Sequence, residues 1–146
     1  MLHETPSLIG ANAVRQQWVP LHRLREKPLL IAWEEPREGV PSSFLLLPRK
    51  DHWVAYQNHC PHWSMPLGER VEDLVDDSMG YIFCTSHAAI FRPRDGECVS
   101  GPCEGDHLIS LEVEEQKEGL WVREVSPFRG QIFAGLAQLE DDAYED

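Results

Sequence analysis

Two short segments, each with one cysteine and one histidine, constrain this chain more than any other feature. The first reads Cys60-x-His62, and after 21 intervening residues the second reads Cys84-x-x-His87. Together they offer two thiolates and two imidazoles, which are common metal ligands in proteins. The spacing therefore predicts a metal centre held between two loops, with Cys60, His62, Cys84 and His87 as its ligands.

Two kinds of centre use two cysteines and two histidines. A 2Fe–2S cluster of the histidine-ligated type has both cysteines on one iron and both histidines on the other. A structural zinc site usually has its two cysteines close together, followed by its two histidines. Here each segment mixes the two residue types, and C-x-H is tighter than zinc sites usually allow. The pattern favours the cluster, and a Cys2His2 structural zinc protein is the alternative.

The two segments resemble those of the Rieske 2Fe–2S family, over roughly residues 17 to 124. The resemblance continues beyond the ligands, through Pro66-Leu67-Gly68, Phe91, Gly96 and Gly101-Pro102. It implies an all-β fold, with a Rieske-like antiparallel β-sandwich or barrel base domain and a small cluster-binding subdomain formed by two loops. It also implies a Rieske-type 2Fe–2S cluster bound by Cys60, His62, Cys84 and His87.

Length and composition are those of one soluble domain. A chain of 146 residues can bury a core without disulfide or metal staples. Its longest apolar runs, 28–33 and 44–48, are too short to span a membrane, and its N-terminus lacks a signal-peptide pattern. We therefore expect a single Rieske domain over residues 1–146, with the cluster-binding subdomain at about 58–105, in the cytoplasm and without a membrane partner.

The charge balance excludes one class of partner. The formal net charge is −12, whereas nucleic-acid binding needs clustered Lys and Arg. An acidic surface suits docking on the basic face of a redox partner, and it equally suits solubility alone. The acidic tail, about 140–146, is expected to be disordered.

Short strand-like runs separated by turn residues fill the rest of the chain. We expect strands in residues 18–21, 28–34, 43–47, 52–57, 81–83, 89–91, 108–114 and 120–122. Residues 69–80 show helical spacing for at most two turns, and 128–139 for a short helix. Residues 1–16 should form an irregular arm, and Trp33, Trp53 and Tyr56 should pack in the core.

The chain departs from the family pattern near the second segment. The family usually has Gly after the second histidine, where this chain has Ala88. Alanine disfavours positive φ, so we expect the loop to differ slightly there. High-potential members carry a disulfide between the two loops, and Met65 and Ser86 at the equivalent positions cannot form it. The resemblance therefore implies a potential at the low end of the Rieske range.

Three further residues lie close to the segments. Cys98 and Cys103 are close enough in sequence for a disulfide, but they would be two free, partly buried thiols in a reducing compartment. His59 is the histidine best placed to support a ligand. Beside the ligands, Trp63, Met65 and Pro66 form either a small apolar docking patch or packing within the loop.

The resemblance implies an electron carrier rather than an enzyme. We expect a soluble Rieske-type ferredoxin that exchanges single electrons with a redox partner protein, a reductase or an oxygenase. An accessory Rieske subunit of a nitrite-reductase-like complex is the alternative. A catalytic Rieske oxygenase needs a second iron bound by two histidines and a carboxylate, and the sequence holds no D-x-x-H-x-x-x-x-H stretch for it.

Overall fold

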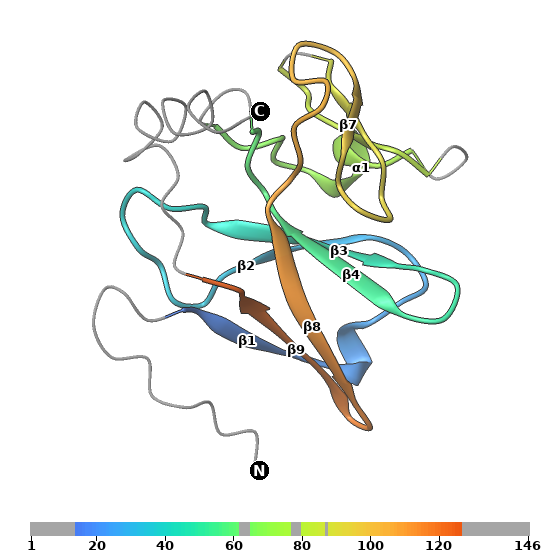
Figure 1. Cartoon of the computed structure of the whole chain (residues 1–146). Coiled ribbons are helices and arrows are strands. Elements are labelled where there is room, and N and C mark those ends of the chain that lie inside the picture. Colours follow the sequence, from blue (N-terminus) through green and yellow to red (C-terminus); the bar gives the residue numbers. More distant parts are fainter. Residues whose placement is uncertain (1–13, 62–64, 77–79, 87, 127–146) are drawn as a thin grey trace.

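The fold is built from two antiparallel sheets. The computed structural model describes residues 14–61, 65–76, 80–86 and 88–126 (Figure 1). A six-stranded sheet has the order β1-β9-β8-β4-β3-β2, and a three-stranded sheet has the order β5-β6-β7. The chain is mostly β and its large sheet is curled into a half-barrel, so the predicted all-β class is confirmed.

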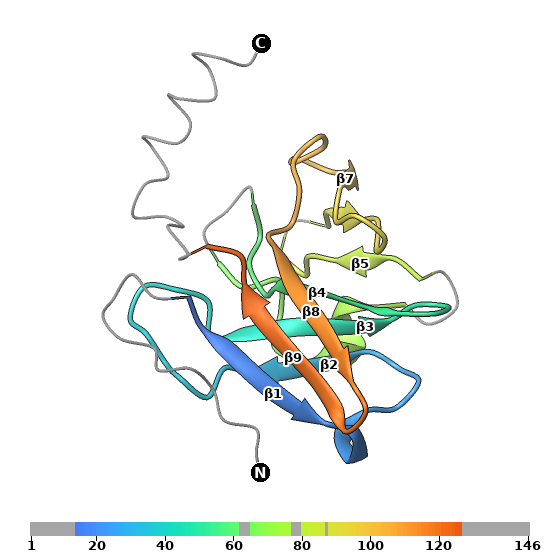
Figure 2. The same cartoon turned by 60° about the horizontal axis from the view of Figure 1, so that its bottom comes forward.

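The large sheet takes strands from both ends of the described chain. Its strands are β1 (Gln16–Pro20), β2 (Leu29–Ala32), β3 (Ser43–Pro48), β4 (Trp53–Gln57), β8 (Ser110–Gln116) and β9 (Gly119–Glu124). β1 pairs with β9 in antiparallel register, with Trp18 opposite Trp121. A short 3-10 turn, Leu21–Arg23, follows β1. Figure 2 shows β1, β9 and β8 side by side across the sheet.

The small sheet is inserted between β4 and β8. Its strands are β5 (Ile82–Phe83), β6 (Ile90–Phe91) and β7 (Cys98–Ser100), and one helical turn, α1 (Val71–Leu74), precedes them. Both views place this sheet on one side of the large sheet (Figures 1 and 2). For residues 69–80 the sequence predicts at most two helical turns, and the described part of this segment contains one, which ends before Val75 forms a β-bridge with Ile82.

The central strands bury both of their faces, which is why β3 reads as a continuous apolar run. Side chains alternate between the two faces of a strand. Leu45 and Leu47 belong to a core shared with the small sheet, whereas Phe44 and Leu46 belong to the core inside the curled sheet. Of the three aromatic residues expected in the core, Trp33 and Tyr56 are buried and Trp53 is partly buried against it.

A buried ion pair anchors Arg15, near the start of the described residues, beside the end of β4. The Arg15 guanidinium donates to Glu124 Oε2 at 2.9 Å, and Gln57 Nε2 donates to the same oxygen at 2.7 Å. Trp33 Nε1 donates to Gln57 Oε1, and the Arg15 guanidinium lies 4.5 Å from the centre of a Trp33 ring. This network holds Gln57, the last residue of β4, three residues before the first cysteine.

Several predictions fall outside the described residues. They concern most of the irregular arm at 1–16, the helix at 128–139 and the disordered tail at 140–146. Within the described part of the chain, no helix is both long enough and apolar enough to cross a membrane.

Candidate metal centre

The two cysteines of the predicted centre lie on separate loops that start at strand ends. Cys60 lies in the first cysteine loop, residues 58–68, which follows β4, and it is completely buried. Its backbone N–H donates to the carbonyl of Met65 at 2.8 Å, which closes the tip of the loop on itself.

Cys84 lies in the second cysteine loop, residues 84–89, between β5 and β6. It is 1% exposed. Its backbone N–H donates to Ala89 O at 3.0 Å, and its carbonyl accepts from Ala88 N–H at 3.0 Å. This loop is therefore also closed on itself.

The structure brings both thiols into one core. Cys60 and Cys84 belong to the same contiguous cluster of buried residues, and neither forms a disulfide. Two buried thiols from two loops fit one half of the predicted donor set, because a pair of thiolates in an apolar core requires a cationic partner. His62 and His87, the other half of the set, lie outside the described residues.

Ala88 adopts the left-handed conformation despite its side chain. Its φ is +58°, and it is the one non-glycine residue with positive φ in the described part of the chain. Alanine disfavours this conformation, yet Ala88 adopts it. The hydrogen bond from Ala88 N–H to Cys84 O shows the physical reason, since closing the loop requires this turn of the backbone.

The residues beyond β6 close over the same core. Gly101 has a φ of +108°, and a side chain there would come within 2.8 Å of the Cα of Ala89. Gly101 therefore packs directly on the second cysteine loop.

Cys98 and Cys103 are free thiols in contact. Their Sγ atoms lie 2.9 Å apart, and both residues are buried rather than partly buried. Burial and the neighbouring thiol of Cys98 raise the pKa of Cys103 well above its usual range. The Cys103 thiol therefore stays protonated and unreactive at neutral pH.

Burial also shifts the pKa values of two nearby titratable side chains. Burial raises the pKa of Tyr56 to about 12, and its hydroxyl donates to Pro93 O at 2.6 Å. Burial lowers the pKa of His59, so its imidazole is neutral near pH 7. Tyr56 thus uses its single proton to hold the turn after β6.

Met65 and Pro66, two of the three residues proposed as a docking patch, are exposed. Trp63, the third, lies outside the described residues. Sequence reasoning assigned no role to Asn58 or Thr85, although both make side-chain hydrogen bonds within the cysteine loops. Their position next to the cysteine motifs was the available signal.

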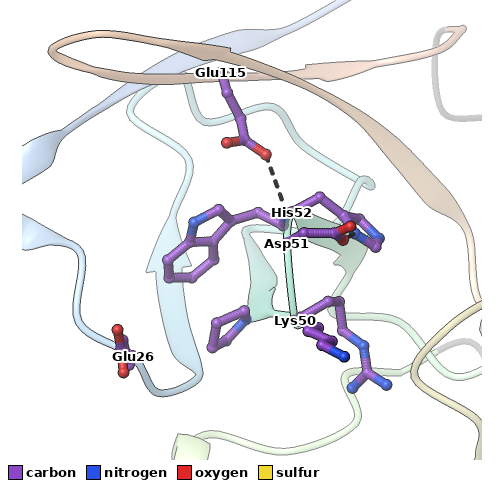
Figure 3. A pocket seen from close by; sticks show the side chains of 8 residues that line it. Glu26, Lys50, Asp51, His52 and Glu115 are labelled. Atoms are coloured by element: carbon purple, nitrogen blue, oxygen red, sulfur yellow. Dashed lines mark hydrogen bonds and ion pairs between the residues drawn. The ribbon is translucent and has the colours of Figure 1, made fainter.

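A pocket of the described surface lies away from the cysteine loops. It has a volume of about 490 Å³ and lies at the turn between β3 and β4, with Glu26, Lys50, Asp51, His52 and Glu115 around it (Figure 3). Asp51 and His52 bond to each other at 2.7 Å, and Glu115 accepts from the backbone of Trp53 at 3.3 Å. None of its lining residues belongs to the cysteine loops.

Comparison with known proteins gives a family and a fold. The model of the Rieske [2Fe-2S] domain matches residues 20–123. A search of curated proteins finds no significant match.

Three solved structures illustrate the fold. One chain in a complex of reduced oxygenase and oxidized ferredoxin in carbazole 1,9a-dioxygenase has a TM-score of 0.56 and 20% identity, over 77% of this chain and 96% of that one. A carbazole-bound oxygenase and ferredoxin complex of carbazole 1,9a-dioxygenase gives 0.56 and 19%, over 74% and 28%. Dicamba monooxygenase gives 0.53 and 22%, over 83% and 37%. This chain therefore spans less than two fifths of the latter two chains.

Proposed function

Because the chain belongs to the Rieske [2Fe-2S] domain family, we propose that it carries single electrons to or from an oxygenase or a related oxidoreductase on another chain. The family match implies a Rieske-type 2Fe–2S cluster as the cofactor. When bound, the cluster supplies one-electron transfer at a potential of about −150 to +300 mV, against about −400 mV for plant-type ferredoxins.

The observation that carries this proposal is the pair of buried cysteines inside the matched region. In the proposed centre, Cys60 and Cys84 bind one iron as thiolates. His62 and His87 bind the other iron as neutral imidazoles. The exposed Met65 and Ser86, which cannot form a disulfide between the loops, support a potential at the low end of the range.

The size of the matched chains favours a separate carrier. About three quarters of this chain aligns with almost all of one chain in the oxygenase and ferredoxin complex, so the matched chain is shorter than this one. In the proposal, the partners are a reductase and an oxygenase, and they dock beside Met65 and Pro66. An accessory subunit of a nitrite-reductase-like complex would use the same centre.

A second candidate is the Rieske domain of an oxygenase, because the fold matches long chains with the same TM-score of 0.56. An oxygenase also needs a mononuclear iron, for which this sequence holds no D-x-x-H-x-x-x-x-H stretch, so the first candidate is favoured. We also propose that residues 58–105, which include the small sheet, form the cluster-binding subdomain of a single domain located in the cytoplasm.

Metal and sulfide analysis tests the proposal. Protein produced with iron should contain about two irons and two acid-labile sulfides per chain and should accept one electron. The Cys84→Ala variant should lack the cluster, whereas Cys98→Ala should retain it. One zinc without sulfide would overturn the proposal.

A further inference from the structure

Two hydrogen bonds join the cysteine loops directly. The backbone N–H and the hydroxyl of Thr85 both donate to the carbonyl of Leu67, at 2.9 and 2.8 Å. Thr85 follows Cys84 in the second loop, and Leu67 lies in the returning part of the first loop. A carbonyl oxygen has two lone pairs, so Leu67 accepts both bonds.

Asn58 holds the same part of the first loop from its other side. Its Oδ1 accepts from Leu67 N–H at 2.8 Å, and its Nδ2 donates to Gly68 O at 2.9 Å. The second Nδ2 proton is donated to Ser43 Oγ at 3.0 Å. The side chain is buried and uses its acceptor and both donors.

Ser43 is the first residue of β3, so Asn58 connects the first loop to the large sheet. The backbone N–H of Asn58 also donates to Ser43 O, at 3.0 Å. The connection thus runs from the sheet through Asn58 to Leu67, and from Leu67 to Thr85 beside the second cysteine.

The chain is closely packed at this point. A Cβ added to Gly68 would lie 2.7 Å from Leu74 Cδ2 and 3.1 Å from Thr85 Cγ2. Leu67 itself is completely buried in the core that holds both cysteines. Separating the two loops would therefore expose apolar surface and leave buried polar groups without hydrogen-bond partners.

We propose that Asn58 and Thr85 are positioning residues that clasp the two cysteine loops together, an inference that rests on the proposed cluster. Each loop is closed on itself, by Cys60 N–H to Met65 O and by Cys84 N–H to Ala89 O. Both cysteines pack in one core, and the bonds from Thr85 to Leu67 add a direct connection between the loops that helps to set Cys60 relative to Cys84. Cluster ligands must keep this relative position closely, and the clasp provides it with hydrogen bonds instead of a covalent link.

The main test uses Thr85, because the residue is exposed and its replacement leaves the core intact. Thr85→Val keeps the shape and removes the hydroxyl bond, whereas Thr85→Ser keeps the bond. Ser86→Ala removes an exposed hydroxyl from the same turn and is the matched control. The measurement is the rate at which the visible cluster absorbance decays in the presence of a chelator.

Thr85→Val should lose its cluster about two- to twelvefold faster, the range that corresponds to the net contribution of one neutral hydrogen bond. Thr85→Ser and Ser86→Ala should match the parent rate. Amide exchange in β8 and β9 should stay unchanged in all three variants, which separates positioning of the loops from general destabilisation. A parent-like rate for Thr85→Val, or equal acceleration in Ser86→Ala, would overturn the proposal.

Asn58→Leu gives an independent readout that does not need the cluster. It should remove the protection of the Leu67 and Thr85 amides against hydrogen exchange while β8 and β9 remain protected. If the parent protein binds zinc or no metal, the proposed function fails, yet this exchange measurement still tests the clasp. Unchanged protection of the two amides in Asn58→Leu would refute it.

Discussion

Ala88 carries backbone strain at a position that glycine would occupy without it. The left-handed conformation costs a non-glycine residue about 1–2 kcal/mol. Its φ of +58° persists because its N–H bonds to Cys84 O and because the neighbouring Ala89 is fixed in the core. The side chain of Ala88 is exposed, so it returns little packing energy for this strain.

Ala88→Gly should therefore stabilise the second cysteine loop, by up to about 1 kcal/mol after the extra freedom of glycine in the unfolded chain is subtracted. Ala32→Gly is the matched control, because Ala32 is exposed on β2 with an ordinary backbone. It should destabilise the protein by about 0.5–1 kcal/mol. The urea midpoint for cluster loss measures the effect of Ala88→Gly on the loop, and the midpoint for sheet unfolding measures the effect of Ala32→Gly on the protein. A loss of stability in Ala88→Gly would show that the loop is not strained.

The elements that were predictable are those with a local sequence signal. The runs at 43–47 and 52–57 predicted β3 and β4 within one residue, and both cysteines were correctly placed in loops after strands. β7 was missed because Cys98–Ser100 is short and pairs with β6 only in the folded chain. The buried Arg15–Glu124 pair and the bond from Thr85 to Leu67 join residues far apart in sequence, so no local sequence pattern predicts them.

Cys98 and Cys103 lie in the segment from β7 to the start of β8, where both are free thiols. Cys103 Sγ–H donates to Cys98 Sγ, and Cys98 Sγ–H donates to Ser100 O at 3.3 Å. Around them, Cys98 N–H donates to Asp106 O, and Gly105 N–H donates to Cys98 O. The thiols are thus sealed inside a segment that is hydrogen-bonded to itself.

We expect Cys98 and Cys103 to resist alkylation at pH 8 in the native protein. The reactive species is the thiolate, and the raised pKa of Cys103 keeps that thiol protonated. Labelling should be at least about a hundredfold slower than in denaturant, where the four cysteines should all react. Mass spectrometry of the alkylated chain counts the labelled sites. A denatured chain that takes only two labels and is lighter by two hydrogens would instead contain a disulfide.

At the scale of the whole molecule, the two faces of the central strands have different tasks. One face of β3 and β4 fills the curled sheet with Phe44, Leu46 and Ala55. The other face carries Leu45 and Tyr56 into the core that contains both cysteines. The large sheet is therefore the rigid base on which the cysteine loops are mounted, and a partner can reach the exposed Met65 and Pro66 without disturbing it.

We expect the net charge of −12 to influence the rate at which the protein associates with a redox partner. Exposed carboxylates lie along β8, at Glu112, Glu114 and Glu115, and on α1, at Glu72 and Asp73. Such a field attracts a cationic partner and repels an anionic one, and salt screens both effects. Oxidation of the reduced protein by basic cytochrome c should therefore slow by about tenfold or more between 10 and 500 mM KCl. Oxidation by the anion ferricyanide should instead become faster over the same range, which controls for any effect of salt on the protein itself. Stopped-flow absorbance measures both rates. Equal salt dependence for the two oxidants would mean that the acidic surface serves solubility alone and does not affect the rate of association with a partner.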